Sequence, residues 1–341
     1  MQDNSGIAAP SAASWQQMMG MIQGYQVTQV VRAAATFSIA DHLLGGNDTA
    51  ASIAAAESID PDATRRLLRA CASLGLTTTE DGIHYTATDL LLTLRKGAPG
   101  SLRGLATSQA ASGHWLPWGL FTDAIRTGQN QTVNAYGTEF WSFLEEHPEE
   151  RTDFTVAMDD LSAVVVGEAQ RLIDTTGVKL AVDVGGASGS LVHGLMARNP
   201  DLHGAVLERA DVVLDAAAAA EKLGLASRFV SITGDFFDSV PAADLYLLKF
   251  VLHDWDDDAC VRILRNCRHA LMPGGRVVVL ETLVPSSGFA ELMDMNMLTL
   301  TNGRERDLTE FDRILRAAGL SRSAVTPTES PLAIIEALPV D

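Results

Sequence analysis

The sequence predicts an α/β protein in which a doubly wound domain follows a mainly helical amino-terminal domain. From Lys179 to Ala337, short apolar segments alternate with helical stretches, which is typical of a parallel sheet with helices on both faces. From Ser14 to about Gly177, apolar residues recur at helical spacing. The length of 341 residues accommodates two domains of this kind.

The composition excludes several classes of function. The formal net charge of −18 argues against nucleic acid or an anionic membrane surface as a partner, because both require basic patches. No apolar run reaches the roughly 18–20 residues that span a bilayer, and residues 1–10 lack the basic start of a signal peptide, so we expect a cytoplasmic protein. The cysteines form no C-x-x-C pair, and Cys260 and Cys267 are too far apart on a helix to share a zinc ion. We therefore expect reduced thiols and no metal.

The amino-terminal part of the chain has the outline of a winged helix. A helical stretch from Ser14 to about Leu44 precedes a helix that Thr49 caps and another that begins at Asp60. A hairpin over residues 77–79 and 83–86 follows, with E-D-G at its turn.

That outline is common in DNA-binding proteins, so its charge matters. Between Asp41 and Gly100, eight acidic residues against five basic ones leave a net charge of −3. Because DNA binding requires a positive surface, we expect residues 1–100 to form a dimerisation domain instead.

Residues 101–177 read as helical and are rich in aromatic side chains. Such clusters usually form core, but part of this one could wall an apolar pocket. We expect the region to contribute to a substrate pocket, with Trp115, Phe121 and Met158 as candidate lining residues.

The second domain, residues 178–341, is expected to hold the sheet. Strands are predicted at 180–184, 204–208, 229–233, 243–249, 276–282 and 332–337, and helices at 211–223, 258–271 and 310–318.

The first strand of the sheet leads into a glycine-rich turn, D-V-G-G-A-S-G. The dinucleotide pattern G-x-G-x-x-G fails from Gly185, because its second and third glycines fall on Ala187 and Ser190. Asp183 followed by this glycine spacing resembles the first motif of S-adenosylmethionine-dependent methyltransferases. A purely structural turn is the alternative.

Ligands of open α/β sheets lie beyond the carboxyl ends of the strands, and polar residues recur there. Glu208 ends the second strand and could accept hydrogen bonds from both hydroxyls of a ribose. Asp235 and Phe236 follow the third strand and could bind the amino group and face of an adenine. Lys249 ends the fourth strand and Glu281 the fifth. We interpret this edge as a site for a nucleoside-type cofactor; solvated carboxylates are the alternative.

His253 comes directly after the fourth strand, beside Asp254. An imidazole has an ordinary pKa of about 6.5, which suits removal of a proton from a hydroxyl near neutral pH. A histidine with a structural role is the alternative.

The whole motif set resembles a known family. D-V-G-G-A-S-G, E-R-A-D-V-V, G-D-F-F, L-K-F-V-L-H-D-W-D-D, P-G-G-R-V-V-V-L-E and N-G-R-E-R-D-L-T-E-F are similar to motifs of small-molecule O-methyltransferases, which include plant caffeate-type enzymes and bacterial polyketide- and phenazine-tailoring enzymes. The resemblance implies a Rossmann-like methyltransferase domain, a winged-helix-like dimerisation domain and a homodimer.

The resemblance also implies roles for individual residues. Bound S-adenosyl-L-methionine would contact Asp183, Gly185, Glu208, Asp235, Phe236 and Lys249. His253 would be the general base, flanked by Glu281 and Glu305, either of which could orient it. Asp254, Met293, Asn296 and Met297 would line the acceptor pocket.

A phenol, with a pKa near 10, is within reach of a histidine base, so we expect an aromatic hydroxyl as the acceptor. Two alternatives stay open. One is a relative that binds the cofactor but catalyses hydroxylation, decarboxylation or a pericyclic reaction, and the other is a non-catalytic binding protein. Two departures from the family pattern are Glu208 in place of the usual Asp and Ala187 in place of a third glycine.

Overall fold

The computed structural model describes residues 10–98, 100–210, 212–286 and 288–340, except for the side chains of 162–165. The chain forms two compact units, Met1–Ala110 and Ala111–Asp341. The second unit therefore contains the sheet together with the helices that precede it from Ala111 onward. No helix in the described residues has the length and apolar character needed to cross a membrane.

The first unit is mainly helical. Its elements are α1 (Ala12–Ile22), α2 (Gly24–Thr36), α3 (Ile39–Leu44), α4 (Ala50–Glu57), α5 (Pro61–Ser73), the strands β1 (Thr77–Thr78) and β2 (Thr86–Ala87), α6 (Asp89–Leu92) and α7 (Arg103–Ser108). The predicted caps are confirmed: the Thr49 side chain accepts from the backbone N–H of Ser52, and the Asp60 side chain accepts from that of Ala63. The hairpin is shorter than predicted.

One helix of this unit presents its apolar side chains to solvent. No residue of α1 is buried, and Trp15, Met18, Met21 and Ile22 are each more than half exposed. The unit's own core is built instead around Ile39, Ile53, Leu68 and neighbouring side chains of α2–α6.

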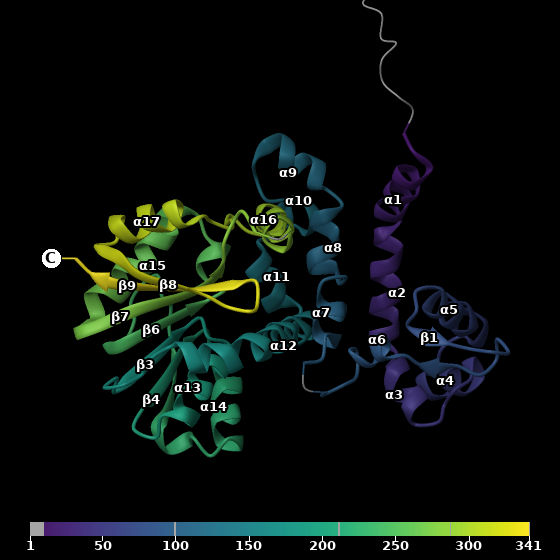
Figure 1. Cartoon of the computed structure of the whole chain (residues 1–341), viewed down its shortest axis with the longest axis horizontal. Coiled ribbons are helices and arrows are strands. Elements are labelled where there is room, and N and C mark those ends of the chain that lie inside the picture. The colour runs from purple at the N-terminus through teal and green to yellow at the C-terminus, as the bar shows by residue number, and fades with distance from the viewer. Residues whose placement is uncertain (1–9, 99, 211, 287, 341) are drawn as a thin grey trace, which may run out of the picture. The chain divides into compact units, whose positions relative to one another are not determined.

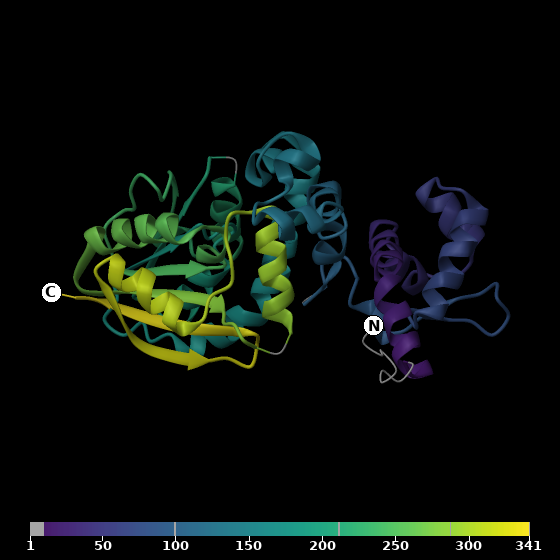
Figure 2. The same ribbon diagram turned by 90° about the horizontal axis from the view of Figure 1, so that it is seen from above.

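The second unit begins with five helices. They are α8 (Ser112–Trp118), α9 (Phe121–Thr127), α10 (Thr132–Tyr136), α11 (Phe140–Glu146) and the long α12 (Pro148–Leu172). Phe140 and Phe143 are buried in a cluster with Leu300 of α16 (Phe289–Leu300), so much of the aromatic content forms core. Figure 2 shows α16 in yellow-green beside these teal helices, and α16 contacts α8 and α9 directly.

The sheet has seven strands in the order β5-β4-β3-β6-β7-β9-β8. They are β3 (Leu180–Val184), β4 (His203–Glu208), β5 (Phe229–Thr233), β6 (Ala243–Lys249), β7 (Leu271–Thr282), β8 (Leu320–Pro327) and β9 (Leu332–Pro339). The first five strands in that order pair in parallel, whereas β9 pairs antiparallel with both β7 and β8.

The prediction of a parallel sheet is therefore wrong for the last predicted strand, which is β9. β8 is not among the predicted strands. The connection from β8 to β9 has only four residues, 328–331, and so short a connection can join only antiparallel strands. β8 is the edge strand and is largely exposed, so it lacks the apolar pattern by which the inner strands were recognised. β7 also begins earlier than predicted, because Leu271 already pairs with Ala243 across a bulge.

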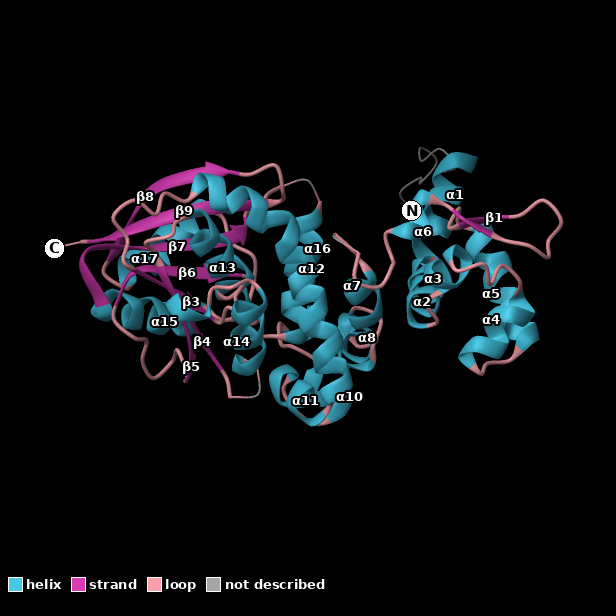
Figure 3. Cartoon of the chain, turned by 90° about the horizontal axis from the view of Figure 1, so that it is seen from below, coloured by secondary structure: helices cyan, strands magenta, loops and turns pink. Residues whose placement is uncertain are grey.

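Helices cover both faces of the sheet, which confirms the doubly wound α/β class (Figures 1 and 3). One face packs on α15 (Asp257–Ala270) and α17 (Leu308–Ala317), and the other on α12, α13 (Ser190–Arg198) and α14 (Val213–Lys222). Successive strand residues alternate between the two cores, as with Ala181 and Val182. The three cysteines are buried and free.

Candidate active site

The glycine loop after β3 lies tightly against two side chains. A Cβ on Gly186 would come within 2.5 Å of Asp183 Cγ, and one on Gly185 within 3.1 Å of Val251 Cγ2. Gly185 also has φ +66°, a conformation that favours glycine. Ala187, which replaces the usual glycine, adopts φ +49°, at a cost of about 1–2 kcal/mol. Its backbone N–H donates to Glu208 Oε2 at 3.2 Å, which joins the loop to the end of β4.

Asp183 is buried beneath this loop without a hydrogen-bond partner. It is 1% exposed, and within the described chain neither carboxylate oxygen has a partner. Burial raises the pKa of Asp183 to about 7, although the charge of Lys249 acts in the opposite direction. A buried carboxylate of this kind requires a donor from a ligand or a water.

The predicted contacts for a ribose and an adenine surround the loop. Glu208 accepts from the backbone N–H groups of Ala187 and Arg209, which holds its carboxylate against the loop. The ring of Phe236 lies so close to Gly185 that a Cβ there would be 3.6 Å from its Cε1. Asp235 is exposed on the turn after β5, the strand beside β4. The predicted cofactor residues thus lie on neighbouring strand ends.

Lys249 ends β6 and lies among carboxylates. Burial lowers the pKa of its ammonium group, and the charges of Asp183, Asp159 and Glu281 oppose this effect. The ammonium also lies 5.1 Å from the ring centroid of Phe250.

Phe250 has φ +54°, a strained conformation for an aromatic residue, and its ring stacks on His253 at 5.3 Å. Phe250 stands within the motif L-K-F-V-L-H-D-W-D-D, but its conformation and its contact with His253 were not predicted. Phe250 marks the bend in the chain between the end of β6 and the turn that carries His253.

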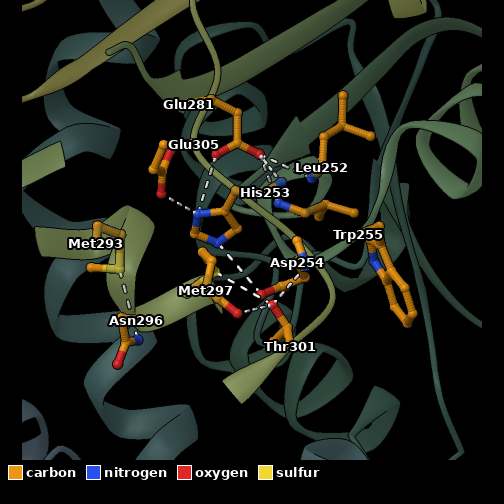
Figure 4. A network of polar contacts seen from close by, with 12 residues as sticks. Leu252, His253, Asp254, Trp255, Glu281, Met293, Asn296, Met297, Thr301 and Glu305 are labelled. Carbon is orange, nitrogen blue, oxygen red and sulfur yellow. Dashed lines mark hydrogen bonds and ion pairs between the residues drawn. The ribbon is translucent and has the colours of Figure 1, made fainter. Parts of the chain in front are cut away.

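His253 lies in the short 3₁₀ turn η2 (Leu252–Asp254) and is enclosed by three carboxylates (Figure 4). Its Nδ1 is 2.8 Å from Glu305 Oε1 and 3.7 Å from Glu281 Oε2, and its Nε2 is 3.7 Å from Asp254 Oδ1. Since a carboxylate only accepts, Nδ1 carries the proton of the bond to Glu305 and Nε2 is the nitrogen left for a substrate.

Glu281 and Glu305 hold different parts of His253. Glu281 Oε1 accepts from the backbone N–H groups of Val251, Leu252 and His253, so it fixes the turn. Glu305 bonds the imidazole itself, and its other oxygen accepts from the Thr282 hydroxyl. The sequence left open which glutamate orients the ring, and the geometry points to Glu305.

The three carboxylates also change the proton affinity of the ring. Burial by itself lowers the pKa of His253, but Glu281, Asp254 and Glu305 together raise it to about 10. The pKa of this ring therefore lies above the ordinary value of about 6.5 for an imidazole.

The segment that carries Glu305 is locked to the turn of His253. Arg306 is 1% exposed, and its guanidinium donates to Asp257 Oδ1 and to the carbonyls of Leu252 and Trp255 at 2.8–3.0 Å. A Cβ on Gly303 would come within 1.8 Å of the His253 carbonyl oxygen. Both residues belong to the motif N-G-R-E-R-D, but their contacts were not predicted from it.

The predicted acceptor residues lie partly on α16. Asn296 is 9% exposed, and its Oδ1 accepts from the indole N–H of Trp118 at 2.8 Å. Its Nδ2 faces the sulfur of Met293 at 3.9 Å. Figure 4 shows Met293, Asn296 and Met297 on the same side of the site as the imidazole of His253.

Three other residues predicted to line the acceptor pocket lie on α8, α9 and α12. Phe121 stacks on Trp118 at 4.9 Å and so belongs to the same wall. Trp115 is half-buried one turn before Trp118 on α8, and Trp118 rather than Trp115 reaches Asn296. Met158 is half-buried on α12, next to Asp159.

His253, Glu281 and Glu305 also offer nitrogen and oxygen atoms within 4.8 Å of one another, a spacing that could hold a metal ion. An ion bound there would have to displace the proton between Nδ1 and Glu305. A metal and a hydrogen-bonded imidazole are therefore mutually exclusive at this position.

Comparison with known proteins gives two matching family models. The model described as the O-methyltransferase domain matches residues 118–321, and the model of the O-methyltransferase dimerisation domain matches residues 19–94.

Individual relatives match over nearly the whole chain. The mitomycin biosynthesis 6-O-methyltransferase of Streptomyces lavendulae is 34% identical over 339 residues, covering 98% of this chain and 97% of that protein. The phenazine O-methyltransferase of Lysobacter antibioticus is 32% identical over 328 residues, covering 95% and 96%. An O-methyltransferase from neocarzinostatin biosynthesis, solved with S-adenosylmethionine and 2-hydroxy-5-methyl naphthoic acid, is similar in structure with a TM-score of 0.81 at 35% identity, covering 92% and 96%.

The charge around His253 predicts the pH dependence of any reaction in which its neutral form accepts a proton. Because the pKa of His253 is raised to about 10, the neutral fraction, and with it kcat/KM, should rise about tenfold per pH unit from pH 6 toward pH 10. Glu305→Gln removes one carboxylate from Nδ1 and should move the midpoint of the profile to lower pH by about one unit or more.

Asp258→Asn is the matched control, since Asp258 is exposed on α15 and only five residues from His253. Its profile should overlay that of the wild type. With one substrate throughout, ionisation of the substrate affects all three profiles equally. If the midpoint of the pH profile does not move in Glu305→Gln, Glu305 does not raise the pKa of the group that accepts the proton.

Proposed function

Because this chain belongs to the O-methyltransferase family, we propose that it uses S-adenosyl-L-methionine to methylate a hydroxyl group of an aromatic small molecule, with His253 as the general base. The observation that carries the proposal is the imidazole of His253, at the edge of the sheet where the glycine loop lies. Glu305 holds its Nδ1, and its Nε2 lies 3.7 Å from Asp254 but forms no hydrogen bond within the described residues. We expect the same reaction class as in the relatives, one of which is named as a mitomycin biosynthesis 6-O-methyltransferase and the other as a phenazine O-methyltransferase.

The residues at the strand ends fit this cofactor. Because Gly185 and Gly186 have no side chain, the loop packs directly on Val251 and Asp183 at the strand ends, and the carboxylate of Asp183 beneath it has no hydrogen-bond partner among the described residues. Glu208 would hold the ribose hydroxyls, and Asp235 and Phe236 the adenine. Glu208 stands where the family usually has the shorter Asp. This replacement is compatible with a ribose contact, because the side chain of Glu208 already reaches the loop at Ala187.

When bound, S-adenosyl-L-methionine supplies a methyl group that is already activated by the sulfonium charge. The protein's task is then to align the acceptor oxygen, which can lower the barrier by about 7–11 kcal/mol in favourable cases. His253 Nε2 removes the hydroxyl proton as the oxygen attacks, which adds about 10²–10⁴-fold. Glu305 stabilises the imidazolium that results, and Glu281 keeps the turn in place.

The raised pKa of His253 favours a phenolic acceptor. A proton passes readily between groups of similar pKa, and a phenol, like the side chain of tyrosine, titrates near 10. An aliphatic alcohol is a far weaker acid. The base is therefore matched to an aromatic hydroxyl.

Asn296 adds a requirement for a second group on the acceptor. An indole N–H can only donate, so Trp118 fixes the amide of Asn296 with its oxygen toward the indole and its NH₂ turned away. The sulfur of Met293 is only a weak partner for that NH₂. An aromatic acceptor with a carbonyl, carboxylate or ring nitrogen would complement this donor.

The exposed apolar face of α1 supports a homodimer. Trp15, Met18, Met21 and Ile22 are 56–65% exposed. The dimerisation-domain model begins at residue 19 and includes the last two of them. Burying such a face against a second copy would remove it from water.

Methyl transfer from radiolabelled S-adenosyl-L-methionine to a panel of phenols, hydroxyquinones and hydroxylated heteroaromatics tests the reaction directly. We expect label in the product with wild-type protein. His253→Ala should reduce turnover by two or more orders of magnitude, because the general base is lost, and should leave cofactor affinity nearly unchanged.

His269→Ala serves as the control for loss of an imidazole, since His269 lies at the end of α15 rather than at the site. Equal activity in wild type and His253→Ala would refute the role of His253 as the general base. Unlabelled but chemically altered substrates, detected by mass, would instead favour non-methylating chemistry.

The dimer can be tested by sedimentation velocity. The double variant Met18→Lys, Met21→Lys places two charges on the apolar face of α1 and should shift the protein toward the mass of one chain. Leu223→Lys, at an equally exposed position at the end of α14, should not. A dimer that persists unchanged in the double variant would contradict this interface.

A further inference from the structure

One acidic side chain beside the glycine loop, that of Asp159, has no role in the proposed reaction. Asp159 lies on α12, ahead of the sheet in the sequence, and is half-buried. Its Oδ1 accepts a hydrogen bond from the hydroxyl of Ser188, which belongs to the glycine loop. A residue from the helical region thus reaches the loop that the cofactor would contact.

Asp159 lies in a region with more negative than positive charge. No lysine, arginine or histidine of the described chain forms an ion pair with it at 4 Å or less. Lys249 acts electrostatically on Asp159 and Asp183, and Glu281 also acts on Lys249, so three carboxylates share one ammonium group. Burial raises the pKa of Asp159 and of Asp183, which indicates that their charges are incompletely compensated.

The second carboxylate is also unpartnered. Asp183 is 1% exposed beneath the same loop, and neither of its oxygens has a hydrogen-bond partner within the described residues. A cationic ligand group with several N–H donors would restore both the charge balance and the missing hydrogen bonds.

We propose that Asp159 binds the α-ammonium group of the methionine portion of S-adenosyl-L-methionine, so that α12 forms part of the cofactor site. The inference rests on the proposed function. An α-ammonium group is protonated near neutral pH in an acidic environment and offers three donors, whereas a carboxylate side chain can only accept. Ser188 holds Asp159 against the loop in the orientation this contact needs.

A purely structural role is the competing explanation, in which Asp159 only tethers α12 to the loop through Ser188. Asp159→Asn separates the two explanations. An asparagine oxygen can still accept from the Ser188 hydroxyl, but the negative charge is gone.

Calorimetric titration with two ligands tests the proposal. S-adenosylhomocysteine has the α-ammonium group, whereas 5′-methylthioadenosine has the nucleoside and the sulfur but no amino acid portion. Asp159→Asn should weaken binding of S-adenosylhomocysteine about tenfold to a hundredfold, as expected for loss of a charge-assisted hydrogen bond. Binding of 5′-methylthioadenosine should change by less than about twofold.

Two controls exclude other causes. Asp215→Asn removes an exposed carboxylate that acts on Asp159 only through its charge, and it should leave both affinities nearly unchanged. S-adenosylmethionine should lose as much affinity as S-adenosylhomocysteine in Asp159→Asn, because both carry the ammonium group.

Three outcomes would overturn the proposal. Equal losses for 5′-methylthioadenosine and S-adenosylhomocysteine would indicate a structural tether. A loss confined to S-adenosylmethionine would assign Asp159 to the sulfonium. Unchanged affinity of Asp159→Asn for all three ligands would show that Asp159 has no role in binding. Failure of the wild type to bind S-adenosylmethionine or S-adenosylhomocysteine would refute the proposed function itself.

Discussion

The contact between the imidazole of His253 and the carboxylate of Glu305 is the interaction on which the rest of the site depends. It fixes the tautomer, so Nε2 rather than Nδ1 is available to an acceptor. Together with Glu281 and Asp254, it raises the pKa of the ring to about 10. A more basic imidazole is a stronger proton acceptor once it is neutral, but less of it is neutral at pH 7. With His253 as the proposed base, the enclosure by carboxylates would favour a phenolic acceptor and would limit the rate at low pH.

This contact joins two segments that are far apart in the chain. The turn at the end of β6 carries the imidazole, and the segment after α16 carries Glu305, whose backbone N–H donates to Asp294 of that helix at 2.9 Å. Arg306 bonds the turn from the other side. The helix that bears Asn296 and the base are therefore held by the same network. A change in α16 that alters the acceptor pocket should therefore also alter the position of the His253 imidazole.

The inner sheet and most of the site could be predicted because parallel strands end at a common edge. Polar residues after successive apolar runs therefore come together in space, as Asp183, Glu208 and His253 do. The division of labour between Glu281 and Glu305 was not predictable, since it depends on which oxygen reaches the backbone and which reaches the ring. Neither was the raised pKa of His253, which arises from the summed charge of separate segments, nor the antiparallel edge, whose outer strand is mostly exposed.

Titration of the His253 imidazole by NMR, in protein labelled at histidine nitrogen and assigned with His253→Gln, measures whether the surrounding carboxylates make this ring more basic. The carboxylate enclosure predicts that the ring of the ligand-free protein stays protonated at both nitrogens through pH 8 and titrates near pH 10. A neutral ring at pH 8 with a midpoint near 6.5 would contradict it. In that case the carboxylates would position His253 without changing its basicity, and the proposed match to a phenol would lose its physical basis.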